Sequence, residues 1–178
     1  DGDLFYLDQK TFDFSGKYFI KKKKNNLDFN LDFNKMPIGI ANAFMNEDVV
    51  NNINGKINGK LKVTGEPIAP VMKGRLFVDD ASANISILGV DLNFNGKLKV
   101  LPDAFIIDNM PVKDEDGNVG NLIATIYHND FSDWNYDVIL DLETNPITHS
   151  KTNKFLVLNT DYKEGDYYYG KAYANGSC

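Results

Sequence analysis

The strongest constraint on this chain is the repeated alternation of apolar and polar residues along its length. Residues 27–34 read LDFNLDFN, so Leu27, Phe29, Leu31 and Phe33 alternate with aspartate and asparagine. Successive side chains of an extended chain point to opposite sides. The pattern therefore predicts a β-strand with one apolar face and one polar face.

Residues 53–63 repeat this pattern with lysine and asparagine on the polar side, and they place Gly55 and Gly59 on the apolar side. Glycine inside a strand gives up side-chain packing, so it indicates a bend or a close approach by another backbone. We expect this strand to stop at residues 65–67 and at Pro70, because proline cannot donate to a ladder. A further strand is expected over residues 73–80.

About ten such runs follow one another, most of them about ten residues long and joined by short turns. The expected strands beyond those named cover residues 4–7, 11–14, 17–20, 90–100, 105–110, 119–128, 134–143, 155–160 and 167–174, with a charged turn over 161–166. We predict an all-β fold of long antiparallel strands. Two arrangements satisfy the pattern: a closed sandwich or barrel, and a curled sheet whose apolar face lines a groove.

One short helix is expected to begin at Pro37, because Met36, Ile40 and Phe44 fall four residues apart. Such a helix either plugs the end of a sheet core or contacts a partner or a membrane. Four consecutive lysines occupy residues 21–24. They form either a solvated turn or a lysine-blunted sheet edge, or a patch that contacts anionic lipid headgroups.

The composition is that of a globular protein, with 43% hydrophobic and 25% charged residues in 178, and we expect one domain over residues 1–178. A net charge of -6 argues against a nucleic-acid surface. No apolar stretch approaches the roughly 18 residues of a membrane span, and we expect no signal peptide within these residues. The first residue is Asp1, which indicates a processed chain or a fragment. Residues 175–178, ending in Cys178, are either native sequence or an added tail.

The sequence offers little for catalysis or metal binding, so we expect no enzyme activity, no cofactor and no metal. His128 and His149 lack partners at metal-ligand spacing. Residues 114–118, DEDGN, resemble half of a calcium loop but lack its remaining ligands. The Asp-Gly pair in this stretch also suits a tight hairpin turn, which is our preferred interpretation.

In the order of its motifs, the chain resembles the conserved C-terminal region of the TamB family (translocation and assembly module), within the AsmA-like superfamily, in its Bacteroidetes-like form. The resemblance covers about three quarters of the chain, and residues 36–52 and the lysine run match poorly. The motifs that carry it are NGKINGKLKVTG (54–65), Pro67, Pro70, GRLFVDDA (74–81), LGV (88–90), HNDFSDW (128–134), FLVLNT (155–160) and YYGKAYA (168–174).

This resemblance implies a periplasmic, elongated, taco-like curled sheet within a longer protein that is anchored in the inner membrane. It also implies partners: phospholipid, a TamA-like outer-membrane protein and client outer-membrane proteins. The corresponding hypothesis is an apolar groove that conducts phospholipid between the two membranes. The expected groove lining is Leu27, Phe29, Leu31, Phe33, Ile57, Leu61, Val63, Leu92, Phe94, Leu98, Val138 and Leu140.

Two alternatives to the lipid groove stay open at this stage. One is an assembly scaffold whose exposed edge pairs with client β-strands. The other is a closed β-sandwich that serves as a spacer.

Overall fold

The protein is all-β, and its strands account for most of the chain. The computed structural model describes residues 1–6, 9–20, 26–39, 42, 47–48, 50–86, 88–130, 132–142, 147–148, 154–164 and 167–174. These residues contain no α-helix, and so no helix that could span a membrane. The strands are β1 (Gly2–Tyr6), β2 (Gln9–Tyr18), β3 (Leu27–Pro37), β4 (Val50–Glu66), β5 (Ala69–Ile85), β6 (Val90–Val100), β7 (Ala104–Lys113), β8 (Val119–Asn129), β9 (Ser132–Asp141), β10 (Phe155–Glu164) and β11 (Tyr167–Ala174).

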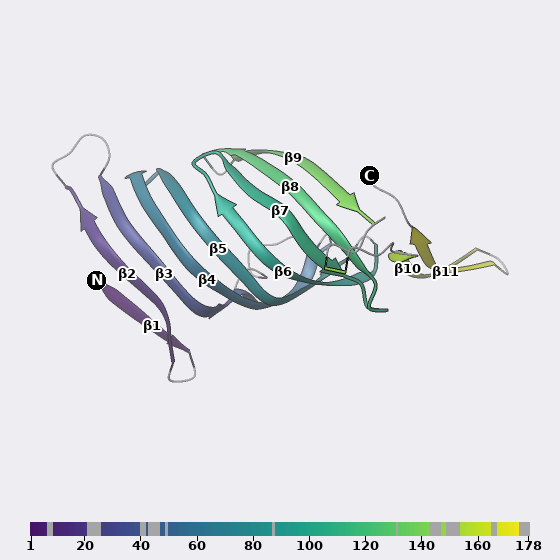
Figure 1. The fold of residues 1–178 in the computed structure, drawn as a ribbon. Helices are drawn as coiled ribbons and strands as arrows, with labels where there is room; N and C mark the ends of the chain where they lie inside the picture. The colour runs from purple at the N-terminus through teal and green to yellow at the C-terminus, as the bar shows by residue number, and fades with distance from the viewer. Residues whose placement is uncertain are drawn as a thin grey trace.

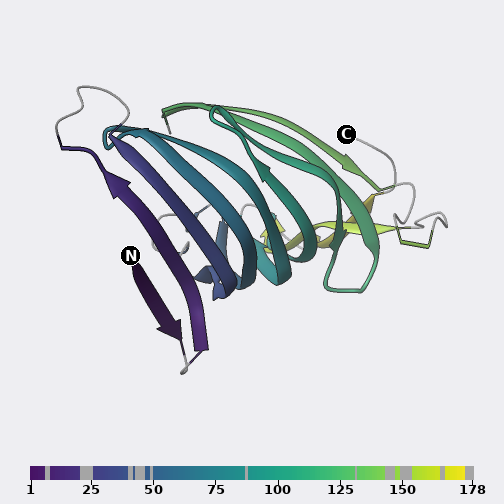
Figure 2. The ribbon, with the colours of Figure 1, turned by 60° about the vertical axis from the view of Figure 1, so that its left-hand side comes forward.

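Strands β1 to β9 form one sheet in which each strand pairs antiparallel with the next along the chain (Figure 1). The remaining strands, β10 and β11, form a separate two-stranded hairpin. Seen from a second direction, the strands of the large sheet curve in the same sense, and the hairpin lies near one end of them (Figure 2). The nine strands thus form a single layer and not two facing sheets of similar size.

Two rows of directly paired apolar residues cross the sheet from β2 to β9. Residues directly opposite each other in an antiparallel pair share a face, so these rows define the apolar face of the sheet. The first row is Phe14, Leu31, Leu61, Gly74, Val100, Phe105, Ile126 and Tyr136. The second is Phe12, Phe33, Gly59, Leu76, Leu98, Ile107, Ala124 and Val138.

A series of β-bulges interrupts the ladders and divides the sheet into two halves. They include residues with positive φ in four strands: Lys35 (φ 50), Gly55 (φ 120), Asp80 (φ 48) and Asn109 (φ 51). A bulge inserts one residue, bends the strand and increases its twist. It also reverses the alternation: in β5, Leu76 faces the apolar side before the bulge, and Ala81 faces it after the bulge.

The prediction for the glycines of β4 is confirmed. A Cβ at Gly59, which has a φ of 130°, would lie 2.3 Å from the carbonyl oxygen of Arg75. A Cβ at Gly55 would lie 2.5 Å from the Cα of Ala81, at one of the bulges. Both positions therefore show a close approach by β5, and Gly55 also lies at a bulge.

Several sequence predictions were wrong at strand ends. The predicted helix does not begin at Pro37, because Met36 and Pro37 are the last residues of β3 and pair with Ile57 and Lys56; Ile40 and Phe44 lie outside the described residues. Pro70 does not stop a strand, because it lies in β5 and pairs there with Gly65 of β4. The runs 11–14 and 17–20 belong largely to one strand, β2, and the expected turn at 161–166 is occupied up to Glu164 by β10.

Two predicted strands are confirmed, and three predicted features lie outside the described residues. The predicted strands over residues 90–100 and 167–174 coincide with β6 and β11. The lysine run at 21–24, His149 and the terminal residues 175–178 lie outside the described residues.

We predict that Gly59→Val destabilises the protein by about 3 kcal/mol, because valine adds a steric clash with β5 to a backbone conformation that side chains rarely adopt. Chemical denaturation measures the change in the free energy of unfolding. Gly39→Ala is the control, since a Cβ there meets its nearest described atom at 3.4 Å. Equal stability of the two variants would contradict the close approach of β5 to Gly59.

Candidate functional site

The candidate site is the part of the apolar face that no second layer covers within the part of the chain that the structure describes. Its buried centre is Leu61, Leu76 and Val100, and the half-buried side chains packed on this centre are Leu31, Phe33, Ile57, Met72, Leu98 and Phe105. We call these nine residues the open region. All of them come from β3 to β7 of the large sheet, so among the described residues they are shielded by neighbours on the same face.

All twelve residues predicted from the sequence to line a groove lie on the apolar face. The structure divides them between different environments. Leu31, Phe33, Ile57, Leu61 and Leu98 belong to the open region. Leu27, Phe29, Val63 and Val138 flank it on β3, β4 and β9. The remaining three, Leu92, Phe94 and Leu140, lie beyond the bulges in a second cluster.

The second cluster is covered by the β10–β11 hairpin, and we call it the covered region. Val112 of β7 and Leu142, which directly follows β9, pack on Phe155 of β10, which is 1% exposed. Leu92, Phe94, Leu122 and Leu140 join them from the sheet side, and Val157 and Ala174 join from the hairpin. The hairpin therefore closes this half of the apolar face and leaves the other half to the open region.

The sequence analysis missed four residues of the open region: Met72, Leu76, Val100 and Phe105. Met72 and Leu76 alternate with Lys73 and Arg75 in β5, so the pattern that identified the other strands was also present there. At the β9 edge, Val138 is 50% exposed and Tyr136 is 62% exposed on the same face. The apolar face thus continues, less shielded, to the last strand of the sheet.

An aromatic cluster lies at the end of the open region nearest the β8–β9 turn. Ring centroids are 5.3 Å apart for Phe105 and His128, 5.3 Å for His128 and Trp134, and 6.3 Å for Phe105 and Trp134. His128 is 6% exposed, and its backbone N–H donates to the carbonyl oxygen of Asp103 at 3.0 Å. The histidine is therefore packed against two aromatic rings at this end of the site.

The turn between β7 and β8 anchors the hairpin through Asp114, which is 1% exposed. The Asp114 carboxylate accepts hydrogen bonds from the backbone N–H of Asn118 at 2.7 Å, from Asn118 Nδ2 at 2.8 Å and from the backbone N–H of Leu156 at 2.7 Å. Gly117 in this turn has a φ of 88°, as the hairpin-turn interpretation of residues 114–118 requires. Asp114 thus joins its own turn to β10.

Exposed polar contacts surround this anchor. The Tyr173 hydroxyl donates to Asp116 Oδ2 at 2.5 Å, and Lys171 Nζ lies 2.6 Å from Glu115 Oε1. The hydrogen bond from Tyr173 lowers the pKa of Asp116, and the same bond raises the pKa of Tyr173. The hairpin is also attached at its middle, where the N–H of Asn159 donates to the carbonyl oxygen of Leu88 at 2.8 Å.

The described part of the chain contains no group of three or more His, Cys, Asp or Glu side chains arranged to hold a metal ion. The chemistry that the open region offers is apolar contact. Comparison of the chain with protein-family models, with curated proteins and with solved structures finds no match. The resemblance to the TamB family therefore stays a prediction from the sequence motifs.

We predict that Asp114→Ala destabilises the docked hairpin by about 2 kcal/mol, because two backbone N–H groups lose a carboxylate acceptor in a buried position. Hydrogen exchange of the β10 amides measures this, and exchange should accelerate there much more than in β4 and β5.

Tyr173→Phe is the matched control, because it removes only the exposed bond to Asp116. Its effect should be smaller and confined to a pH window. Asp116 has a lowered pKa in the folded state, so its contribution is lost as the pH falls below its ordinary value of 3.8. Tyr173 has a raised pKa, so its contribution is lost as the pH rises through that raised value, above 10.0. A larger effect for Tyr173→Phe than for Asp114→Ala would contradict the anchoring role of Asp114.

Proposed function

We propose that this chain is a periplasmic segment of a TamB-like protein and that its apolar face is part of a groove that conducts phospholipid between the inner and outer membranes. The full-length protein is anchored in the inner membrane in this proposal. The observation that carries it is the open region: a contiguous set of large aliphatic and aromatic side chains without an overlying layer among the described residues. Its centre is buried, with Leu61 and Leu76 7% and Val100 1% exposed, so the apolar surface offered to a ligand is that of the partly buried residues around this centre. Accessible apolar surface marks interaction sites when it is contiguous.

The chemistry of the open region suits an acyl chain. Each CH₂ group that leaves water for an apolar surface gains roughly 0.8 kcal/mol, without any requirement for directional bonds. The side chains offered are Leu, Ile, Val, Met and Phe, and the glycines in the two apolar rows leave backbone close to the surface. A curled sheet would shield such a chain while its headgroup stays in water at the rim.

An open surface also suits transport better than a closed pocket does. Binding energy spread evenly along paired rows from β2 to β9 lets a chain move in small steps, without one deep trap. Larger assemblies of such sheets would lengthen the path. A TamA-like outer-membrane protein and client outer-membrane proteins are the partners of this proposal, which also includes support of outer-membrane protein assembly.

The variant that tests the groove is Val138→Asp, because Val138 is on the apolar face and is 50% exposed, so a carboxylate there can reach water. We expect the purified protein to bind a fluorescent fatty acid or phospholipid at least several-fold more weakly in this variant, since a carboxylate on the apolar face must stay hydrated. Binding is measured by fluorescence titration, and co-purified lipid by mass spectrometry.

The matched control is Ile139→Asp, which makes the same kind of change at the next residue of β9. Ile139 is 43% exposed and faces the polar side. Equal loss of lipid binding in both variants, or no lipid binding by the unaltered protein, would contradict the proposal. Leu92 is less suitable for this test, because it lies in the covered region and a charged side chain there would disturb the hairpin.

A second candidate function is an assembly scaffold that binds client β-strands by edge pairing. The observation in its favour is that β1 and β9 are the end strands of the large sheet, each with one paired neighbour among the described strands. An edge strand presents unpaired N–H and C=O groups to an incoming strand.

Proline distinguishes the edge-pairing function from the lipid groove. Alternate residues of an edge strand point their N–H groups outward. Tyr136 and Asp137 are consecutive in β9, so one of the two variants Tyr136→Pro and Asp137→Pro removes an outward donor and leaves the hydrogen bonds to β8 intact. That variant should lose binding to a client strand and keep lipid binding, as measured with a synthetic β-strand peptide and the fluorescent lipid. Loss of lipid binding alone would exclude edge pairing as the main function.

A further inference from the structure

The polar face of the sheet carries a concentration of positive charge that the net charge of -6 does not lead one to expect. Every lysine and arginine of β4, β5 and β6 lies on this face, opposite the open region. They include Arg75, the single arginine of the chain. The set is Lys56, Lys60, Lys62, Lys73, Arg75, Lys97 and Lys99.

Like charges stand directly opposite each other within this set. Lys60 pairs with Arg75 across β4 and β5, Arg75 pairs with Lys99 across β5 and β6, and Lys62 pairs with Lys73. Like charges in directly opposite positions of a sheet destabilise it. The arrangement therefore carries a cost in stability that packing of the sheet does not explain.

Only the β3 side of this cluster is neutralised. Lys60 Nζ lies 2.7 Å from Asp32 Oδ2, and Lys62 forms an ion pair with Asp28. Among the ion pairs of the described residues, none involves Lys73, Arg75, Lys97 or Lys99. Positive charge thus remains uncompensated on β5 and β6.

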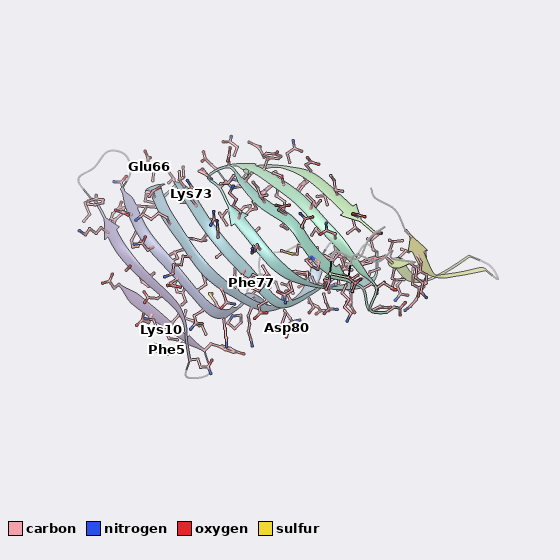
Figure 3. All side chains as sticks on the ribbon, in the orientation of Figure 1. Phe5, Lys10, Glu66, Lys73, Phe77 and Asp80 are labelled. Carbon is pink, nitrogen blue, oxygen red and sulfur yellow. The ribbon has the colours of Figure 1, made fainter. Side chains whose placement is uncertain are left out.

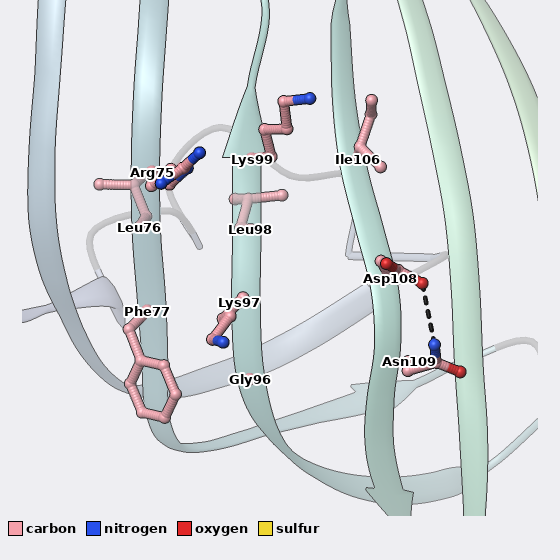
Figure 4. A pocket seen from close by; sticks show the side chains of 10 residues that line it. All are labelled: Arg75, Leu76, Phe77, Gly96, Lys97, Leu98, Lys99, Ile106, Asp108 and Asn109. Atoms are coloured by element: carbon pink, nitrogen blue, oxygen red, sulfur yellow. Dashed lines mark hydrogen bonds between the residues drawn. The ribbon is translucent and has the colours of Figure 1, made fainter.

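A cavity of about 610 Å³ lies beside these uncompensated cations, between β5, β6 and β7 (Figure 4). It occurs where the β6–β7 ladder is interrupted, between the pairs Phe94–Val112 and Leu98–Ile107. Its charged and apolar lining includes Arg75, Lys97 and Lys99, with Phe77, Ile106 and Asp108. Phe77 is 39% exposed on the polar face, where Figure 3 marks it on the same strand as Lys73.

We propose that this cavity is a binding site for a phosphate-bearing anion, held by Arg75, Lys97 and Lys99. The guanidinium of Arg75 matches two phosphate oxygens with two parallel N–H donors, and the lysines add positive charge from the neighbouring strand. The anion would remove the repulsion between Arg75 and Lys99. Asp108, whose Oδ1 accepts from Asn109 Nδ2 at 3.0 Å, repels an anion from the β7 side and so places it nearer β5 and β6.

The inference goes beyond the lipid groove, because the cations that would hold the anion lie on the opposite face of the sheet. Leu76 and Leu98 of the open region also line the cavity, but they carry no charge for the anion. The phosphate has two possible sources, a soluble phosphorylated compound and the headgroup of an anionic lipid. The open region and the phosphate site can therefore fail or succeed independently in experiments.

The experiment measures binding of inorganic pyrophosphate by isothermal titration calorimetry at low salt. We expect binding by the unaltered protein, a loss of about tenfold or more in Arg75→Gln and in Lys99→Gln, and a smaller but clear loss in Arg75→Lys, which keeps the charge and loses the two-donor geometry. Binding should weaken with added salt, because the cations are near the surface. Lys17→Gln, on β2, is the control and should bind as the unaltered protein does.

A thermal unfolding scan separates loss of the site from loss of the fold. Arg75→Gln and Lys99→Gln each remove one member of a like-charge pair, so their melting temperatures should equal or exceed that of the unaltered protein. Absence of pyrophosphate binding, or equal binding by Arg75→Gln and the unaltered protein, would overturn the proposal. Binding of an acidic peptide without binding of pyrophosphate would also overturn it and indicate a protein-docking surface.

Vesicles identify the source of the phosphate. Co-sedimentation with phosphatidylglycerol vesicles but not with phosphatidylcholine vesicles, reversed by pyrophosphate and abolished by Arg75→Gln, would support a lipid headgroup. Pyrophosphate binding without vesicle binding would support a soluble phosphorylated compound. Val138→Asp, which is expected to weaken the lipid groove, should leave pyrophosphate binding unchanged, so a failure of the lipid groove is distinguishable from a failure of this site.

Discussion

The register between neighbouring strands is the constraint on which the rest of this structure depends. A shift of one residue in any strand would move its apolar side chains to the polar face, so the two apolar rows exist only if every ladder from β2 to β9 keeps its register. The β4–β5 ladder is the longest of these, with 17 residues in each strand. Gly59 in this ladder lets the backbone of β5 approach β4 where a side chain would collide with it.

The bulges turn this uniform sheet into two different halves. Each inserted residue reverses the alternation, so a strand can present apolar side chains to the same face on both sides of a bend. Beyond the bend, the hairpin of β10 and β11 covers the face, since the buried carboxylate of Asp114 and the carbonyl of Leu88 provide fixed partners for its backbone. Before the bend, the described residues provide no such layer, and the open region remains.

The two faces of β4, β5 and β6 have opposite chemistry, and both follow from one alternating pattern. In the same strands, Leu61, Leu76 and Leu98 lie on one face and Lys60, Arg75 and Lys99 on the other. An apolar ligand and an anionic ligand therefore suit opposite sides of a single layer of backbone. The like-charge pairs on the polar face reduce the stability of the sheet, whereas the apolar rows increase it. Folding therefore accounts for the apolar rows, and the like-charge pairs require another role, such as ligand binding.

The sequence by itself determined the fold class, the direction of most side chains and the two glycines at which the backbone of β5 approaches β4. All twelve predicted lining residues share one face, because alternation is a local property that each strand carries independently. Only the tertiary structure decided that Leu92, Phe94 and Leu140 are covered while Leu31 and Leu98 are not, that Pro37 and Pro70 belong to strands, and that Arg75 lies between Lys60 and Lys99. These features depend on which strands are neighbours and in what register, and pairing across the sheet is not encoded in the period of any one strand.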